Sequence, residues 1–229
     1  KERSEISKSC LMKNYLKNRK ILEDGHAYSR NMEHDACGVG LIASTEGKKS
    51  RKVVEYGINA LKAVFHRGAV DADGKTGDGA GIHLEIPSNF FAEKIELTGH
   101  KHDGSEICIG MIFLPRNNYE AQENARTLIE SELTKSNFSI YGWRQVPVNT
   151  KVLGEKANFT RPEITQVLFK NNDKNLMGKS LERKIYESRR KIEKEAIKNA
   201  LEGFYICSLS SKSIIYKGMF LAESIADFY

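Results

Sequence analysis

The spacing of apolar residues predicts helices and strands in alternation from about residue 38 onward. Val54, Ile58, Leu61 and Phe65 recur at helical intervals, so we expect a helix over residues 50–66 with one buried face. Gly68 is well placed for a left-handed cap just after it. Other helices are predicted after Ser88-Asn89, which we expect to cap one, and over residues 119–133, 150–158, 181–201 and from about 222.

Strands are predicted where apolar residues alternate or run together over several positions. These stretches are residues 38–45, 82–87, 107–114, 138–148, 164–169, 204–209 and 213–220. Consecutive strands can pair as hairpins and helices separate others, which indicates a mixed α and β fold with helices packed on sheets. Residues 1–36 have short apolar pieces among many charges and no sustained period, so we expect a weakly ordered leader.

The composition is that of a soluble globular protein, with 40% hydrophobic and 29% charged residues in 229. No apolar run approaches the roughly 20 residues that span a bilayer, so we expect no membrane segment. No secretory signal is visible, and the cysteines are not closely paired, which together favour the cytoplasm. The chain begins with Lys1 and stops inside a predicted helix, so we expect it to belong to a longer protein.

The net charge of +6 comes mostly from one region. Residues 170–198 hold ten Lys or Arg and five Asp or Glu on a predicted helix, with acids between the bases. This pattern is typical of a solvated helix face. Because no basic stripe with interleaved aromatic residues is present, we expect no nucleic-acid partner.

Four cysteines lie far apart, at Cys10, Cys37, Cys108 and Cys207. No CxxC pair is present, so we expect no zinc or iron–sulfur site within this segment. Cys108 and Cys207 lie inside apolar strands and are predicted to be buried.

Cys37 is the candidate nucleophile, since it lies before two glycines and at the head of an apolar run. A free thiol has a pKa near 8.5 and needs a base at neutral pH. One of the histidines (His34, His66 or His83) is one solution. The other is cleavage after Ala36, because the new α-amino group, with a pKa of about 7.7–8, suits a general base. A plain structural cysteine at the start of a strand remains the alternative to both.

The stretch from Asp71 to Gly81 has four glycines in eleven residues. Such density predicts positive φ angles or close backbone approaches. A phosphate-binding loop is one alternative, but the full Walker pattern is absent. We therefore favour a structural loop that shapes the site.

Three motifs together resemble the N-terminal region of glutamate synthase large subunits, which is a class II glutamine amidotransferase domain. They are Asp35-Ala36-Cys37-Gly38-Val39-Gly40, then His66-Arg67-Gly68-Ala69, then Asp73-Gly74-Lys75-Thr76-Gly77-Asp78-Gly79-Ala80-Gly81. The first two motifs resemble class II amidotransferases in general, and the third, followed by Ile86-Pro87 and Phe90-Phe91, resembles the glutamate synthases. The resemblance covers residues 33–229.

The resemblance implies an α+β fold, the four-layer αββα sandwich of N-terminal-nucleophile hydrolases, incomplete here at its C-terminal end. It implies a propeptide over residues 1–36 and an amidotransferase domain over residues 37–229. Cys37 would hydrolyse L-glutamine through a thioester, and Arg67 and Gly68 would help hold its geometry. The ammonia would pass to downstream synthase domains of the same chain, which reductively aminate 2-oxoglutarate. FMN and an iron–sulfur cluster are expected there, with an electron-donating small subunit or ferredoxin as partner.

Two motifs of the family are not found in this chain: an arginine that binds the glutamine carboxylate and an Asn-Gly pair that forms the oxyanion hole. A missing oxyanion donor typically costs about 2.7–4 kcal/mol of transition-state stabilisation, so we expect this segment alone to be close to inactive. Two alternatives stay open. One is a non-catalytic or unprocessed regulatory module, and the other is a class II amidotransferase with another ammonia acceptor.

Overall fold

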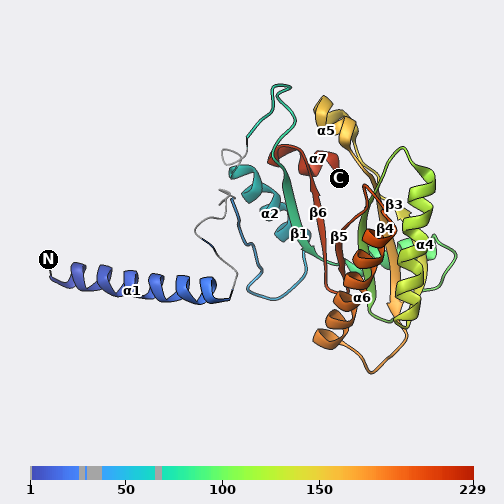
Figure 1. Ribbon diagram of the computed structural model, residues 1–229, viewed down its shortest axis with the longest axis horizontal. Helices are drawn as coiled ribbons and strands as arrows, with labels where there is room; N and C mark the ends of the chain where they lie inside the picture. Colours follow the sequence, from blue (N-terminus) through green and yellow to red (C-terminus); the bar gives the residue numbers. More distant parts are fainter. Residues whose placement is uncertain (1, 26–28, 30–37, 65–68) are drawn as a thin grey trace. The chain divides into compact units, whose positions relative to one another are not determined.

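The computed structural model describes residues 2–25, 29, 38–64 and 69–229, and for residues 2–11 the backbone only. It divides into two units, residues 1–37 and 38–229, which are treated separately below. In the first unit, α1 (Glu2–Asp24) is a single helix of 23 residues (Figure 1). This helix was not predicted from the sequence, because residues 1–36 show no sustained apolar period. Lys, Arg, Glu and Leu favour helix intrinsically, and no glycine or proline interrupts them before Gly25.

The second unit is built on a four-stranded antiparallel sheet in the order β3-β4-β2-β5. Its strands are β2 (Ile107–Leu114), β3 (Phe138–Gln145), β4 (Glu163–Asn171) and β5 (Tyr205–Ser210). Side chains of β2 alternate between the two faces: Ile109 and Met111 enter one hydrophobic cluster, and Cys108 and Ile112 enter the other. Because β2 is buried on both faces, its sequence is continuously apolar.

Two long helices, α4 (Tyr119–Lys135) and α6 (Gly178–Lys198), cover one face of this sheet (Figure 1). Their buried side chains, such as Ile129 and Ile185, pack on Cys108 and Ile112. The opposite face of α6 carries an exposed ion pair four residues apart, Arg183–Glu187, which confirms the predicted solvated helix face.

A second, two-stranded antiparallel sheet packs on the other face and consists of β1 (Ala80–Glu85) and β6 (Ser213–Gly218). β5 and β6 follow one another closely but belong to different sheets, so the chain crosses from one sheet to the other at residues 210–212. Between the sheets lie Met111, Leu168 and Ile214, all fully or nearly fully buried. α3 (Ser88–Glu96), α5 (Glu155–Thr160), α7 (Ile225–Phe228) and the 3-10 turns η2 (Thr150–Val152) and η3 (Ala222–Ser224) complete this region.

Helix α2 (Arg51–Ala63) lies beside β1 and begins at Ser50, whose hydroxyl accepts a hydrogen bond from the backbone N–H of Val53 (Figure 1). The predicted helix is confirmed, but its apolar face is only partly covered, and no residue of α2 is buried among those described. The expected end of the helix at Gly68 lies outside the described residues. α3 also differs in detail, since it begins at Ser88 with Pro87 at the N-cap and has no side-chain cap.

The apolar run after Cys37 is not a buried strand, so that prediction is wrong. Residues 38–44 have no regular structure, and Val39 and Leu41 are 90% and 89% exposed. An apolar sequence forms a strand only where another strand supplies hydrogen bonds, and β1 takes its described partner from β6. The fold class itself is confirmed as α+β, with helices packed on antiparallel sheets.

Candidate functional site

The three site residues predicted from sequence, Cys37, Arg67 and Gly68, lie outside the residues that the structure describes, as do His34 and His66. Their described neighbours are Gly38 and Ala69. His83 is described and lies on an exposed position of β1. What the structure shows directly is therefore the frame that begins one residue after Gly68.

That frame is a tight loop over residues 69–78, which we call the glycine loop. Its two ends pair at the bridge between Val70 and Gly77. Asp78 holds the first residue twice, because its carboxylate accepts the backbone N–H of Ala69 at 2.9 Å and its own N–H donates to the Ala69 carbonyl at 3.3 Å. Ala69 is therefore fixed relative to the start of β1.

The tip of the glycine loop docks on the first turn of α5. Asp73 accepts hydrogen bonds from the N–H groups of Lys75 and Thr76 at 2.9 and 2.7 Å and from the Thr76 hydroxyl at 2.6 Å. The Thr76 hydroxyl in turn accepts the backbone N–H of Ala157 at 3.3 Å. Gly154 precedes α5 and has no side chain to cap it, so Thr76 supplies from another segment the oxygen that an N-cap residue normally provides.

Close packing at this junction requires a glycine. A Cβ atom on Gly154 would lie 2.1 Å from the Asp73 carboxylate and 2.3 Å from the Thr76 hydroxyl. The hydrogen bond from the Thr76 hydroxyl, followed by those from the backbone amides, holds the pKa of Asp73 well below its usual range. Asp73 is thus ionised at neutral pH, and it occupies amides that a phosphate-binding loop would offer to its ligand. The expectation of a structural loop is confirmed.

The glycine loop also contacts the end of the second unit. Gly77 is buried against the carbonyl group of Phe220, which a Cβ atom would approach to 2.9 Å. Phe220 packs on Phe228 with ring centroids 5.1 Å apart. Tyr229 lies edge-on to Phe228, and its hydroxyl donates to the carbonyl of Lys217 at 2.8 Å. The loop is therefore held from both sides, by α5 and by this aromatic cluster.

Sequence reasoning missed a polar group where β3, β4 and β6 meet. Gln166 of β4 is completely buried, and its carbonyl accepts a hydrogen bond from Nη1 of Arg144 at 2.8 Å. Its amide donates to the Tyr216 hydroxyl at 3.4 Å, and the Arg144 guanidinium lies 5.5 Å from the centre of the Phe90 ring. The available signal was polar residues at inward positions of strands that are otherwise apolar.

Comparison with known proteins decides the family. The sequence model of the family described as "Glutamine amidotransferases class-II" matches residues 37–229, which is most of the chain. The chain belongs to the class-II glutamine amidotransferases. The match starts at Cys37 itself, the residue that the sequence singled out as nucleophile.

Relatives of this amidotransferase domain are glutamate synthases. It is 52% identical over 212 residues to "Glutamate synthase [NADPH] large chain" of Azospirillum brasilense, covering 93% of this chain and 14% of that protein. It is 38% identical over 198 residues to "Ferredoxin-dependent glutamate synthase 2" of Synechocystis, covering 86% and 12%. The Bacillus subtilis "Glutamate synthase [NADPH] large chain" is 37% identical over 209 residues, covering 88% and 13%. The chain thus spans about one seventh of the length of these relatives.

The other cysteines of the amidotransferase domain are unsuited to nucleophilic chemistry. Cys108 is fully buried and Cys207 is 4% exposed, as predicted. Burial raises the pKa of both thiols, so they remain protonated at neutral pH.

No cluster of metal-binding side chains is present among the described residues. His100 and His102 instead make local contacts with Thr98 and the Ser105 carbonyl. Within the described ranges, no helix is long and apolar enough to cross a bilayer.

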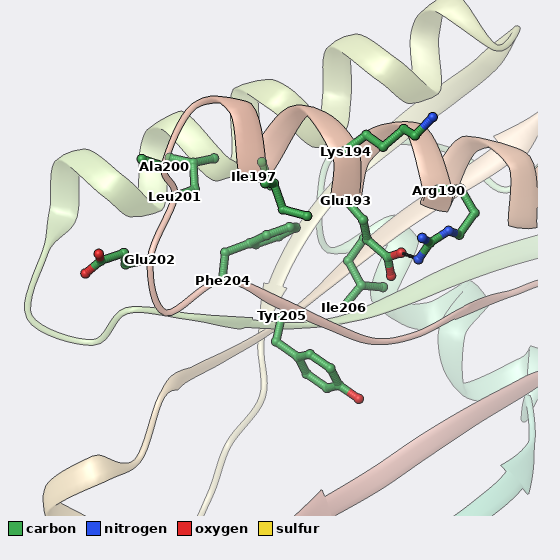
Figure 2. A pocket seen from close by; sticks show the side chains of 11 residues that line it. Arg190, Glu193, Lys194, Ile197, Ala200, Leu201, Glu202, Phe204, Tyr205 and Ile206 are labelled. Carbon is green, nitrogen blue, oxygen red and sulfur yellow. Dashed lines mark hydrogen bonds and ion pairs between the residues drawn. The ribbon is translucent and has the colours of Figure 1, made fainter. Parts of the chain in front are cut away.

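A hollow of about 500 Å³ lies between the end of α6 and the start of β5. Figure 2 shows Ile197 and Phe204 pointing toward one another across it, while the ring of Tyr205 points away. Arg190 and Lys194 contribute charge at its rim. No cysteine, serine, threonine or histidine is found among its lining residues, so it offers no thiol or hydroxyl nucleophile of these types for amide hydrolysis.

Proposed function

We propose that residues 37–229 are the glutamine-hydrolysing domain of a glutamate synthase and that Cys37 is its nucleophile. The observation that carries the proposal is that the family match begins at Cys37 itself. In the proposal, residues 1–36 are a propeptide, and cleavage after Ala36 makes Cys37 the first residue.

The chemistry follows from a thiol and an amine on one residue. The free α-amino group of Cys37 accepts the thiol proton, and the sulfur attacks the side-chain carbonyl carbon of glutamine. The C–N bond breaks, the proton passes to the leaving nitrogen, and ammonia departs from a thioester. Water then attacks the thioester, with the amine as base again, and releases glutamate and the thiol. While residue 36 is attached, the nitrogen is an amide and cannot act as this base.

Arg67 and Gly68 are proposed to hold the reactive geometry beside Cys37. What supports this is the adjoining glycine loop, since Ala69 is bonded to Gly68 and is anchored by Asp78. The Asp73–Thr76 contact with α5 then keeps this anchor from shifting. A geometric error of about 1 Å in such a site costs on the order of 100-fold in rate, so a rigid frame is what the chemistry needs.

The proposed fold is the four-layer αββα sandwich of N-terminal-nucleophile hydrolases. The order of contacts in the second unit supports it: α4 and α6 lie on the four-stranded sheet, this sheet packs on β1 and β6, and α2 lies against β1. The half-covered apolar face of α2 is consistent with a layer that further chain completes.

For the whole protein, we propose that the ammonia is passed to 2-oxoglutarate for reductive amination to glutamate by downstream domains of the same chain. FMN and an iron–sulfur cluster would lie in those domains, outside this segment, and electrons would come from a small subunit or from ferredoxin. Both donor types occur in the names of relatives, which give NADPH for one group and ferredoxin for the other. A cytoplasmic location fits this biosynthetic role.

The decisive experiment combines the N-terminal mass of the full-length protein with its hydrolysis of glutamine. We expect Cys37 as the first residue, loss of hydrolysis in Cys37→Ala, and wild-type hydrolysis in the matched control Cys207→Ala after correction for folded protein. An intact leader on fully active enzyme would refute the free-amine mechanism. Hydrolysis that survives Cys37→Ala would refute Cys37 as the nucleophile. Absence of hydrolysis in the wild-type protein would favour the non-catalytic module.

A further inference from the structure

The cluster around Arg144 is built to hold a guanidinium. Gln166 has no exposed surface. Its side-chain carbonyl accepts a hydrogen bond from Arg144, and its side-chain NH2 donates one to Tyr216. Burying an amide is favourable only if its hydrogen bonds are made, and here both go to polar side chains. Gln166 therefore fixes the Arg144 and Tyr216 side chains relative to one another.

The charge of Arg144 is not balanced within the described part of the chain. Two other partly buried arginines have an acid beside them: Arg126 pairs with Glu123, and Arg189 pairs with Glu193. For Arg144 the described polar partner is the neutral Gln166. A guanidinium has five N–H donors in a planar fork that matches a carboxylate, and one of them is used here.

Burial shifts the pKa of both outer groups of the cluster in the direction expected for groups removed from water. It lowers the pKa of Arg144, and it raises the pKa of Tyr216. The Tyr216 hydroxyl accepts from Gln166 and keeps its own O–H, for which no acceptor is found in the described ranges. The cluster thus offers a partly desolvated cation and a hydroxyl donor together, held by one buried amide.

We propose that Arg144 and Tyr216 form a carboxylate-binding site where β3, β4 and β6 meet. The carboxylate comes either from an Asp or Glu side chain elsewhere in the full-length protein or from a free amino acid of the glutamine and glutamate type. The chemistry is the same for both sources: a fork of charged N–H donors and one O–H donor, with the Phe90 ring as the wall behind the guanidinium. The inference goes beyond the proposed function and does not depend on it, since it uses none of the residues of the Cys37 motif.

The test uses the full-length protein with Cys37→Ala, so that binding is measured without turnover. Arg144→Met removes the fork, and Tyr216→Phe removes only the hydroxyl. Gln166→Glu places a carboxylate beside the guanidinium and should compete with the natural one. Arg126→Met is the matched control, because Arg126 also lies over an aromatic ring but has its own acid.

If the carboxylate belongs to a free amino acid, calorimetry with L-glutamine and L-glutamate should show Kd rising at least about tenfold in Arg144→Met and Gln166→Glu. Tyr216→Phe should give a smaller rise, and Arg126→Met none. If the carboxylate is a side chain of the protein, the Kd for the amino acids should be unchanged. Amide exchange in β3 and β6 should then accelerate at least about tenfold in Arg144→Met, Gln166→Glu and Tyr216→Phe. Should neither quantity change beyond its change in Arg126→Met, the site does not bind a carboxylate. If Arg144→Met does not fold, two other variants test the site by the same two measurements. They are Arg144→Lys, which keeps the charge and loses the fork, and Tyr216→Phe.

Discussion

Removal of the Thr76 hydroxyl should release the glycine loop from α5. Thr76 is 2% exposed, donates to Asp73 at 2.6 Å and accepts the Ala157 N–H at 3.3 Å. Thr76→Val keeps the shape of the side chain but removes both hydrogen bonds. The Ala157 N–H, in a residue that is itself only 5% exposed, then has no cap.

The magnitude follows from the buried N–H. Leaving such a donor without a partner costs about 1–3 kcal/mol, and loss of a helix N-cap costs about 0.5–2 kcal/mol. Where the ranges overlap, about 1–2 kcal/mol, the local opening equilibrium shifts about 5-fold to 30-fold. Amide exchange of residues 69–78 and 154–160 in the full-length protein should accelerate by this factor, because exchange reports local opening directly.

Thr160→Val is the matched control. Its hydroxyl bonds to the Lys156 carbonyl on the exposed side of the same helix, so its loss should change the opening free energy by less than about 0.5 kcal/mol. Equal exchange rates in Thr76→Val and Thr160→Val would contradict the capping role. Gly154→Ala should also open the loop, and less so when Asp73→Ala has already removed one of the two side chains that its methyl group meets.

Three further outcomes are expected. Gly110→Ala should destabilise the domain by about 1–3 kcal/mol through overpacking, since its Cβ would lie 2.6 Å from a buried methyl group of β4; an unchanged unfolding midpoint would contradict this. Native alkylation followed by peptide mapping should leave Cys108 and Cys207 unlabelled, because burial raises the pKa of both thiols. The Lys170 ammonium holds the pKa of Asp103 below its usual range. The stabilisation by this pair is therefore present above the ordinary pKa and lost as pH falls through the lowered one. In Lys170→Met, acid-induced exchange of residues 98–105 should begin at a higher pH, and an identical onset would argue against the ion pair.

Local sequence patterns predicted the elements that depend on local forces or on burial from both sides. β2 was predicted with the observed bounds because a central strand is apolar at nearly every position. The α2 helix was also predicted, but the prediction that its apolar face is buried was wrong, since burial depends on what packs against the helix. The prediction of a strand over residues 38–44 was wrong for a similar reason, because their apolar sequence does not show whether a partner strand is available.

The residues of the candidate site also differ in how far the sequence could predict them. Cys37 came from its sequence context, Arg67 and Gly68 came from the family resemblance, and all three stay predictions because they lie outside the described residues. The capping of α5 by Thr76 joins positions about 80 residues apart in sequence, which no local pattern encodes. Arg144 and Gln166 were visible as polar residues in apolar strands, but their meeting with Tyr216 depends on the packing of two sheets.

The pairing of β1 with β6 has a consequence for how the domain is made. About 130 residues separate the two strands, and all four strands of the larger sheet are completed between them. At about 5–20 residues per second, β6 leaves the ribosome about 7 to 26 s after β1. During that interval Ile82 and Leu84 have no strand beside them, so the larger sheet and its helices are expected to fold first and the smaller sheet to close last. Chaperone dependence of a nascent chain stalled before residue 213 should therefore exceed that of one stalled beyond residue 218, once the ribosomal tunnel is allowed for.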